Sequence, residues 1–275
     1  MLTPVAQRWR EGRALYRPAG EPINTNAYEV ATIPGDATAK AFVLEHHYSA
    51  SYPAARRRFG LYRGASLVGV AVFSVPANTA ALACLPGEPL ASLELGRFVL
   101  VDDVPANGET WFLARCFEEL RREDFVGVVS FSDPCARPRR DGTVVFPGHV
   151  GTIYQASNAV YLGRSKAETV RLLPDGSVLH RRALAKLRNG EVGRAYVEAL
   201  LRRHGAPERG DEDVRCWTSS ALDQLTTPLR HGGNHKYAWT LQRADRRHLP
   251  ASLPFPKVRD PRAALQRPLD FTEAA

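Results

Sequence analysis

Two segments of the sequence place proton-exchanging side chains where an active site could form. The first is EHHYSAS at residues 45–51, which follows an expected helix and holds two histidines and a tyrosine. His46 and His47 are neighbours and cannot share one face of a helix, so at most one of them can point into a site. Tyr48 follows His47 directly. A histidine is also favoured at a helix C-terminus by the helix dipole, and the sequence leaves both interpretations open.

The second segment runs from Asp133 to Tyr154. Asp133 follows FVGVVSFS (125–132), a short apolar run that predicts a buried central strand. Sites in open α/β sheets lie beyond the carboxyl ends of the strands, so Asp133 stands where a catalytic carboxylate is expected. An aspartate before a proline is equally common as the start of a turn.

The residues around Tyr154, GHVGTIYQASNAVYLGRS (148–165), predict a short helix followed by a strand. TIYQASN is long enough for barely two helical turns, and Asn158 suits the left-handed conformation that ends a helix. VYLGR then begins a strand. Tyr154 is thus expected one turn before a helix end and directly ahead of a strand. That position suits a reactive group or a half-buried core tyrosine.

Hydrophobic periodicity predicts the elements that position these segments. A helix is expected over 37–47, with Ala41 and Leu44 on its apolar face, and the longest helix over 107–124. A helix between two strands of one sheet implies a right-handed crossover, so an α/β arrangement follows. The expected strands are 57–64, 66–74, 92–101, 125–132, 160–164 and 235–243, with a further hairpin about 174–176 and two short helices within 183–205.

The predicted organisation is a single domain with two extensions. Residues 1–35 contain four prolines and are expected to form a loop-rich N-terminal extension. Residues 36–245 hold every motif with chemistry and are assigned to the catalytic domain, and residues 246–275 to a C-terminal tail.

Charge is distributed unevenly along the chain. The net charge is +8 and the pI is about 9.6. Residues 1–135 carry 13 Lys and Arg against 15 Asp and Glu, whereas residues 136–275 carry 24 against 14. This asymmetry favours a polyanionic partner, most simply nucleic acid, although a solvated basic surface is the alternative. The sequence shows neither a run of roughly 18 apolar residues nor a signal peptide, so we expect no membrane association and a cytoplasmic protein.

Several classes of site are excluded by missing motifs. The four cysteines are scattered without a CxxC pair, which argues against a zinc ribbon. HExxH and the H-x-E…P-C-x-x-C signature of zinc deaminases are absent, as are GxSxG and the GxxxxGK[ST] P-loop.

Five stretches carry a resemblance to a known family. They are HHYSAS (46–51), LELGRFVLVDDVPANGETWFLARCF (93–117), GVVSFSDP (127–134), GHVGTIYQASNAVYLGR (148–164) and GGNHKYAW (232–239). With these segments the chain resembles the Mom family, phage proteins that modify adenine in DNA. The resemblance implies a Gcn5-related N-acyltransferase-like fold, a mixed sheet flanked by helices. It also implies an anti-restriction function and N6-(carbamoylmethyl)adenine as the product.

The resemblance assigns roles to individual residues. His47, Tyr48 and Asp133 would be catalytic, and Tyr154 would protonate the leaving group as in related acyltransferases. Arg97, in the strand before the longest helix, would bind the cofactor. Thr110, at the N-terminus of that helix, would do the same.

The expected cofactor is acetyl-CoA or another activated donor. The loop that binds coenzyme A pyrophosphate in such folds is glycine-rich, whereas DDVPANGET here has only Gly108 and the acidic Asp102 and Asp103, which oppose an anion. The product joins nitrogen to a CH2 group, whereas plain acyl transfer would give an amide. A redox metal or an activated glycine-type donor would supply the missing step, with candidate iron ligands at His47, Tyr48, Asp133 and His149.

The expected partner is double-stranded DNA, with the target base flipped out of the duplex. Arg137, Arg139 and Arg140 lie between the two site segments and are predicted to meet phosphates, and His235 and Lys236 are predicted to form a second contact. Two other functions remain open at this stage. One is a non-catalytic DNA-binding protein with an acyltransferase-like shell, and the other is an ordinary N-acetyltransferase acting on an amine metabolite or protein.

Overall fold

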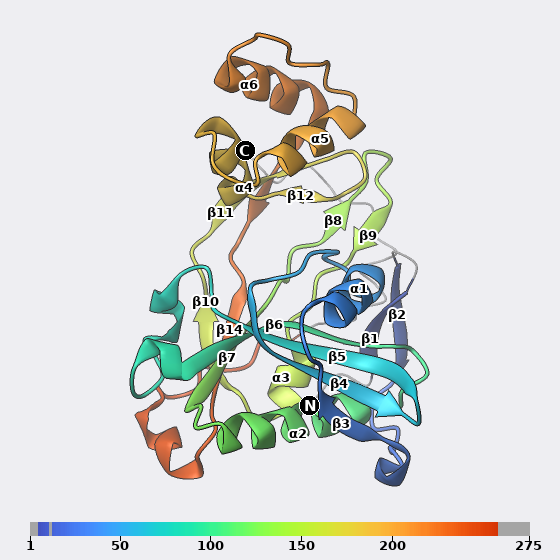
Figure 1. Ribbon diagram of the computed structural model, residues 1–275, viewed down its shortest axis with the longest axis vertical. Coiled ribbons are helices and arrows are strands. Elements are labelled where there is room, and N and C mark those ends of the chain that lie inside the picture. Colours follow the sequence, from blue (N-terminus) through green and yellow to red (C-terminus); the bar gives the residue numbers. More distant parts are fainter. Residues whose placement is uncertain (1–4, 11–12, 258–275) are drawn as a thin grey trace. The chain divides into compact units, whose positions relative to one another are not determined.

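The computed structural model describes residues 5–10 and 13–257, which divide into two compact units (Figure 1). The first, here called the sheet unit, comprises 5–10, 13–134, 149–165 and 234–257. The second, here called the insert unit, comprises 135–148 and 166–233. The chain therefore leaves the sheet unit and returns to it twice. The boundaries expected at residues 35 and 245 do not coincide with this division.

The sheet unit is built on a seven-stranded mixed sheet in the order β10-β14-β7-β6-β5-β4-β3. Only β6 and β7 pair in parallel, and α2 connects them as the expected crossover. The strands are β3 (Glu29–Thr32), β4 (Ala55–Arg63), β5 (Ser66–Ser74), β6 (Ser92–Leu100), β7 (Gly127–Ser132), β10 (Val160–Arg164) and β14 (His235–Thr240). The helices are α1 (Ala37–His46), α2 (Gly108–Arg122) and α3 (Thr152–Ala156). The expected mixed sheet flanked by helices is confirmed.

Helices α1 and α2 cover opposite faces of this sheet, because alternate residues of β5 point to opposite sides (Figure 1). Ala71 and Phe73 pack in the cluster that includes α2, whereas Val70 and Val72 pack in the cluster that includes α1. The predicted apolar face of α1 was wrong. Its buried residues are Ala39, Phe42 and Val43, while Ala41 and Leu44 are exposed. Ala39, Phe42 and Val43 follow the i, i+3, i+4 spacing that one buried helix face requires.

The parallel pairing of β6 and β7 ends early. It covers only Ser92–Glu94 against Gly127–Val129, although both strands continue. On the other side of β6, the register with β5 shifts between Leu95 and Arg97, so Gly96 is an inserted bulge residue. Strands β6 and β7 therefore separate after Glu94. The residues that follow in the two strands are not paired with one another.

The segment after β7 ends in α3, the predicted short helix. Gly151 precedes it with a φ of 70°, and a Cβ there would lie 2.7 Å from the Tyr154 ring, so glycine is required. Asn158 has a φ of 60°, the left-handed conformation expected at the end of this helix.

The N-terminal region carries more structure than its prolines suggest. β1 (Val5–Arg10) and β2 (Arg13–Pro18) pair as an antiparallel hairpin, and β3 joins the main sheet. The expected loop-rich extension is therefore wrong for this part of the chain. Their sequences, VAQRWR and RALYRP, show no strict alternation of apolar and polar residues, so the strand pattern was not evident in the sequence. Short 3-10 helices complete the unit at Thr25–Ala27, Thr79–Leu82, Pro89–Ala91 and Arg243–His248.

The insert unit has its own hydrophobic core of eleven buried residues, among them Leu173, Leu187 and Trp217. Its elements are β8 (Arg137–Pro138), β9 (Val144–Phe146), β11 (Glu168–Leu172), β12 (Val178–Leu179), β13 (Thr227–His231), α4 (Arg181–Arg188), α5 (Ala195–Arg203) and α6 (Val214–Leu225). Helix α6 was not predicted. Among the helices of the described residues, none is long and apolar enough to cross a lipid bilayer.

Candidate active site

Arg97 lies at the centre of the candidate site, directly after the bulge in β6. Its guanidinium donates to the Ser51 carbonyl oxygen from Nε at 2.7 Å and to Ser51 Oγ from Nη2 at 2.6 Å. Burial lowers the pKa of Arg97, while Tyr48, Glu94 and Tyr154 act in the opposite direction. Through these bonds, Arg97 connects the segment after α1 to strand β6 at the point where β6 and β7 separate.

The His47 ring is held in one orientation by Ser49. The Ser49 backbone N–H donates to His47 Nδ1 at 3.1 Å, and Ser49 Oγ lies 2.9 Å from the same nitrogen. Because Nδ1 accepts, the proton of the neutral ring is assigned to Nε2. Burial, and then the charges of Arg97 and His149, lower the pKa of His47 well below its usual value. The ring is therefore neutral at neutral pH and offers Nε2–H as a donor.

Tyr48 joins this histidine to the second predicted segment. Its ring stacks on His47 with the centroids 4.3 Å apart, and its hydroxyl lies 3.4 Å from His149 Nε2. The His149 backbone N–H donates to the Asp133 carbonyl oxygen at 2.7 Å. The two segments singled out in the sequence, around residues 47 and 149, thus meet in the sheet unit.

Tyr154 is buried in α3, facing the end of β7. Burial raises the pKa of Tyr154, an effect that a hydrogen bond with Ser130 opposes. Its ring packs against Tyr237 and Trp239, with centroids 5.3 and 5.5 Å away. Glu94 and Arg97 both act on it electrostatically. Tyr154 is therefore a protonated phenol at neutral pH, held rigidly beside the parted strands.

Glu94 is a site residue that the sequence analysis missed. It is the last β6 residue paired with β7, and burial raises the pKa of its carboxyl although Arg97 opposes that rise. A signal was present, because Glu94 interrupts an apolar strand between Leu93 and Leu95. A charge within an apolar strand is costly unless it has a partner or a function.

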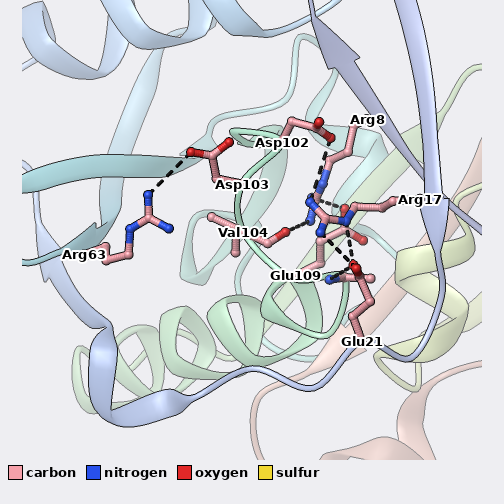
Figure 2. A network of polar contacts seen from close by, with 9 residues as sticks. Arg8, Arg17, Glu21, Arg63, Asp102, Asp103, Val104 and Glu109 are labelled. Atoms are coloured by element: carbon pink, nitrogen blue, oxygen red, sulfur yellow. Dashed lines mark hydrogen bonds and ion pairs between the residues drawn. The ribbon is translucent and has the colours of Figure 1, made fainter.

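The N-terminus of α2, where the resemblance placed a pyrophosphate, is already occupied by the protein itself (Figure 2). Glu21 Oε2 accepts from the Ala106 backbone N–H at 3.2 Å, and the Glu21 carbonyl oxygen accepts from the Asn107 N–H at 3.2 Å. Thr110 Oγ1 donates to the Asn107 carbonyl oxygen at 3.1 Å. The groups that would bind a phosphate are thus satisfied internally. Gly108 packs tightly instead, since a Cβ there would lie 2.6 Å from Val104.

The same region holds further acidic and basic side chains (Figure 2). Arg8 bonds to the Glu109 carboxylate and donates to the Val104 carbonyl oxygen at 3.0 Å. Arg17 bonds to Glu21 and lies 3.9 Å from Asp102. These residues do not fit a coenzyme A pyrophosphate, because both arginines already pair with carboxylates and the acidic side chains oppose an anion.

The candidate iron ligands named from the sequence are His47, Tyr48, Asp133 and His149. Over residues 5–10 and 13–257, no group of three or more His, Cys, Asp or Glu side chains is arranged to hold a metal ion. His47 Nδ1 is also taken by Ser49. The Tyr48 hydroxyl, a further candidate ligand, lies 3.4 Å from His149 Nε2. Iron binding stays a prediction.

The five residues predicted to contact DNA are divided between the two units: three arginines lie in the insert unit, and His235 and Lys236 lie in the sheet unit. Arg137 lies over the Phe146 ring, with the guanidinium carbon 4.7 Å from the centroid, while Arg139 and Arg140 are exposed on the β8–β9 hairpin of the insert unit. His235 is buried in β14 and hydrogen-bonds to the Tyr161 hydroxyl at 2.7 Å. Burial lowers the pKa of His235 to about 4, so it is neutral. The expected phosphate contact at His235 is therefore wrong, and its neighbour Lys236 is half-buried.

Comparison with known proteins places the chain in a family. No curated protein matched it. Among solved structures, it is similar to a tandem GNAT protein from the clavulanic acid biosynthesis pathway, without AcCoA, with a TM-score of 0.40 and 10% identity over 78% of this chain and 99% of that one. That likeness is too low to carry an argument. The family match extends over residues 27–257, which include His47, Tyr48, Glu94, Arg97 and Tyr154. The chain belongs to the Mom protein family.

Proposed function

We propose that this protein is a DNA-modifying transferase that converts adenine in duplex DNA to N6-(carbamoylmethyl)adenine and so protects the DNA from restriction. The observation that carries the proposal is the placement of Arg97 where β6 and β7 part: it hydrogen-bonds to Ser51 and acts electrostatically on His47 and Tyr154, in a member of the Mom family. The net charge of +8 supports a polyanionic substrate.

The roles of the residues follow from the proton balance. When the N–C bond forms, the adenine amino group loses one proton and the leaving group of the donor departs. Asp133, a buried carboxyl group at the end of β7, is the proposed base. His47 orients the substrate through Nε2–H, because its Nδ1 is occupied. Tyr154 supplies the proton to the leaving group.

The proposed donor is an activated carbamoylmethyl compound. Its binding does not use a pyrophosphate site at the N-terminus of α2. The adenine amino group is paired inside the duplex, so the base must be extruded at a cost on the order of a few kcal/mol. The proposed partner is double-stranded DNA, from which a single adenine is extruded.

The test is mass spectrometry of nucleosides from DNA of cells that express the protein, beside cells with an empty vector. The modified deoxyadenosine should appear only with the protein. If the modified nucleoside is absent but duplex binding has a steep salt dependence, the protein binds DNA without modifying it. Absence of both would indicate an N-acetyltransferase of another substrate class.

Asp133→Asn is expected to lower modification by about 100-fold or more, because an amide cannot accept the adenine proton. The amide matches the carboxyl group in size, so the fold should persist, which circular dichroism checks. Asp141→Asn, on the exposed β8–β9 turn, is the matched control and should leave modification unchanged. Near-normal modified adenine with a folded Asp133→Asn would remove the proposed base.

Replacement of Arg137, Arg139 and Arg140 by alanine is expected to weaken duplex binding and to reduce its salt slope by about two to three units, since each lost phosphate contact removes roughly one. Sequence preference should not change. The matched control replaces three arginines of the same unit that already have acidic partners, Arg171, Arg182 and Arg202. This control removes the same charge. A slope that changes equally in both triple variants would mean that the β8–β9 hairpin makes no special contact.

A further inference from the structure

The N-terminal hairpin contributes an aromatic side chain to the candidate site. Trp9, on β1, meets the Tyr48 ring edge to face with the centroids 6.1 Å apart. Tyr48 in turn stacks on His47 and meets the His149 ring at 5.7 Å. Four rings from three separate segments of the sheet unit therefore form one aromatic group, here called the ring cluster.

The ring cluster differs from the aromatic core beside it. Trp9, His47, Tyr48 and His149 are all half-buried, whereas Tyr154, Tyr237 and Trp239 are buried. Large aromatic side chains of a folded core normally bury most of their surface. Partly exposed rings beside a reactive site are instead available to a ligand with a flat, apolar face.

The placement of Trp9 depends on its neighbour Arg8. Successive residues of a strand point to opposite sides, so Arg8 and Trp9 face different surroundings. Arg8 is 5% exposed and bonds to Glu109 and to the Val104 carbonyl oxygen at the start of α2 (Figure 2). Arg17, on β2, secures the other strand of the hairpin through Glu21. The hairpin is thereby fixed to the sheet unit, and Trp9 is held beside Tyr48.

We propose that Trp9 and Tyr48 form a stacking platform for the extruded adenine base, with Arg8 as the residue that positions it. The proposal rests on the proposed function and names the part of the site that receives the substrate. A purine presents a flat π face, and stacking on aromatic side chains is how proteins hold unpaired bases. The platform includes the ring stacked on His47, and His149, which meets Tyr48, is hydrogen-bonded through its backbone to Asp133.

The test uses short single-stranded DNA, which removes the cost of base flipping. Two oligonucleotides are compared, one with a single 2-aminopurine flanked by abasic sites and one in which that position is also abasic. The wild-type protein should bind the first more tightly and quench its fluorescence. Trp9→Ala should weaken that binding by about 5- to 150-fold and abolish the quenching, while binding of the fully abasic strand stays the same.

Two variants separate stacking from packing. Trp9→Phe keeps an aromatic face and should retain most of the preference, whereas Trp9→Leu keeps an apolar side chain and should lose it. Tyr196→Ala removes an exposed ring in the insert unit and is the control that should have no effect. Hydrogen exchange over β1 and β2 establishes that the hairpin remains folded in each variant.

The outcomes distinguish the platform from the proposed function. A wild-type protein that binds both oligonucleotides equally, or a Trp9→Leu variant that keeps the full preference, would overturn the platform. If the preference depends on Trp9 but cells contain no modified adenine, the platform stands and the proposed reaction fails. If modified adenine is made at the normal rate by Trp9→Leu, the reaction stands and the platform fails.

Discussion

Tyr154→Phe is expected to lower the rate of adenine modification by about 100- to 10,000-fold, the range over which a positioned proton donor acts. The variant lacks only the hydroxyl. Its ring should still pack against Tyr237 and Trp239, so the unfolding transition should stay close to that of the wild type. Burial raises the pKa of Tyr154, so the phenol keeps its proton throughout the neutral range and the defect should not depend on pH there.

The measurement is the single-turnover rate of purified enzyme on duplex DNA, which isolates the chemical step from product release. Tyr161→Phe is the matched control, because Tyr161 is also a buried tyrosine of the sheet unit and bonds to His235 rather than facing Ser130. If both variants lose activity equally, the effect of Tyr154→Phe is structural. If Tyr154→Phe keeps its rate, another group protonates the leaving group.

Arg8→Met is expected to lower the free energy of unfolding by about 3–5 kcal/mol, because it leaves the carboxylate of Glu109 buried without its partner. The two side chains are only 3% and 15% exposed. The double variant Arg8→Met with Glu109→Leu should recover most of the loss, since a buried ion pair can be exchanged for apolar packing. Arg17→Met is the control. Arg17 and Glu21 are 21% and 32% exposed, so solvent screens this pair more than the Arg8–Glu109 pair and the loss should be smaller.

This loss should depend on pH in a defined direction. Burial raises the pKa of Glu109, and Arg8 opposes that rise, so removing Arg8 raises the pKa further. A carboxyl group whose folded pKa exceeds its unfolded value is stabilised while protonated, and this stability is lost as the pH rises through the folded pKa. The effect of Arg8→Met should therefore be small near pH 4 and full at neutral pH in chemical denaturation. An equal loss at both values would contradict the account.

The parts of the fold that depend on local sequence were predictable. The short helix and strand around Tyr154 follow from the turn chemistry of Asn158, whose positive φ angle the structure confirms. The long helix α2 follows from its apolar periodicity. His47, Tyr48 and His149 were named from the sequence as candidate metal ligands, and in the structure Tyr48 stacks on His47 and its hydroxyl lies 3.4 Å from His149 Nε2.

The parts that depend on distant contacts were not predictable. Arg8 and Glu109 are 101 positions apart, and nothing in either neighbourhood indicates the other. The position of Trp9 beside Tyr48 depends on this contact between Arg8 and Glu109, which the sequence around Trp9 does not indicate. Helix α6 was missed for a different reason. Thr218, Ser219 and Ser220 weaken its helical propensity, and its cap comes from Asp213, which accepts from Arg215 and Cys216.

Two segments of the chain, 135–148 and 166–233, leave the sheet unit, and the sheet-unit residues that flank each segment lie next to one another. The His149 N–H donates to the Asp133 carbonyl oxygen at 2.7 Å, which closes the shorter segment. The longer one is closed by Ser165 and Asn234, which exchange two hydrogen bonds of 2.8 Å each. The two ends of each segment are therefore held together within the sheet unit. The entropic cost of closing a loop increases only weakly with the length of the loop. Such places tolerate insertion and deletion, so the insert unit is expected to tolerate changes in length without rebuilding the seven-stranded sheet.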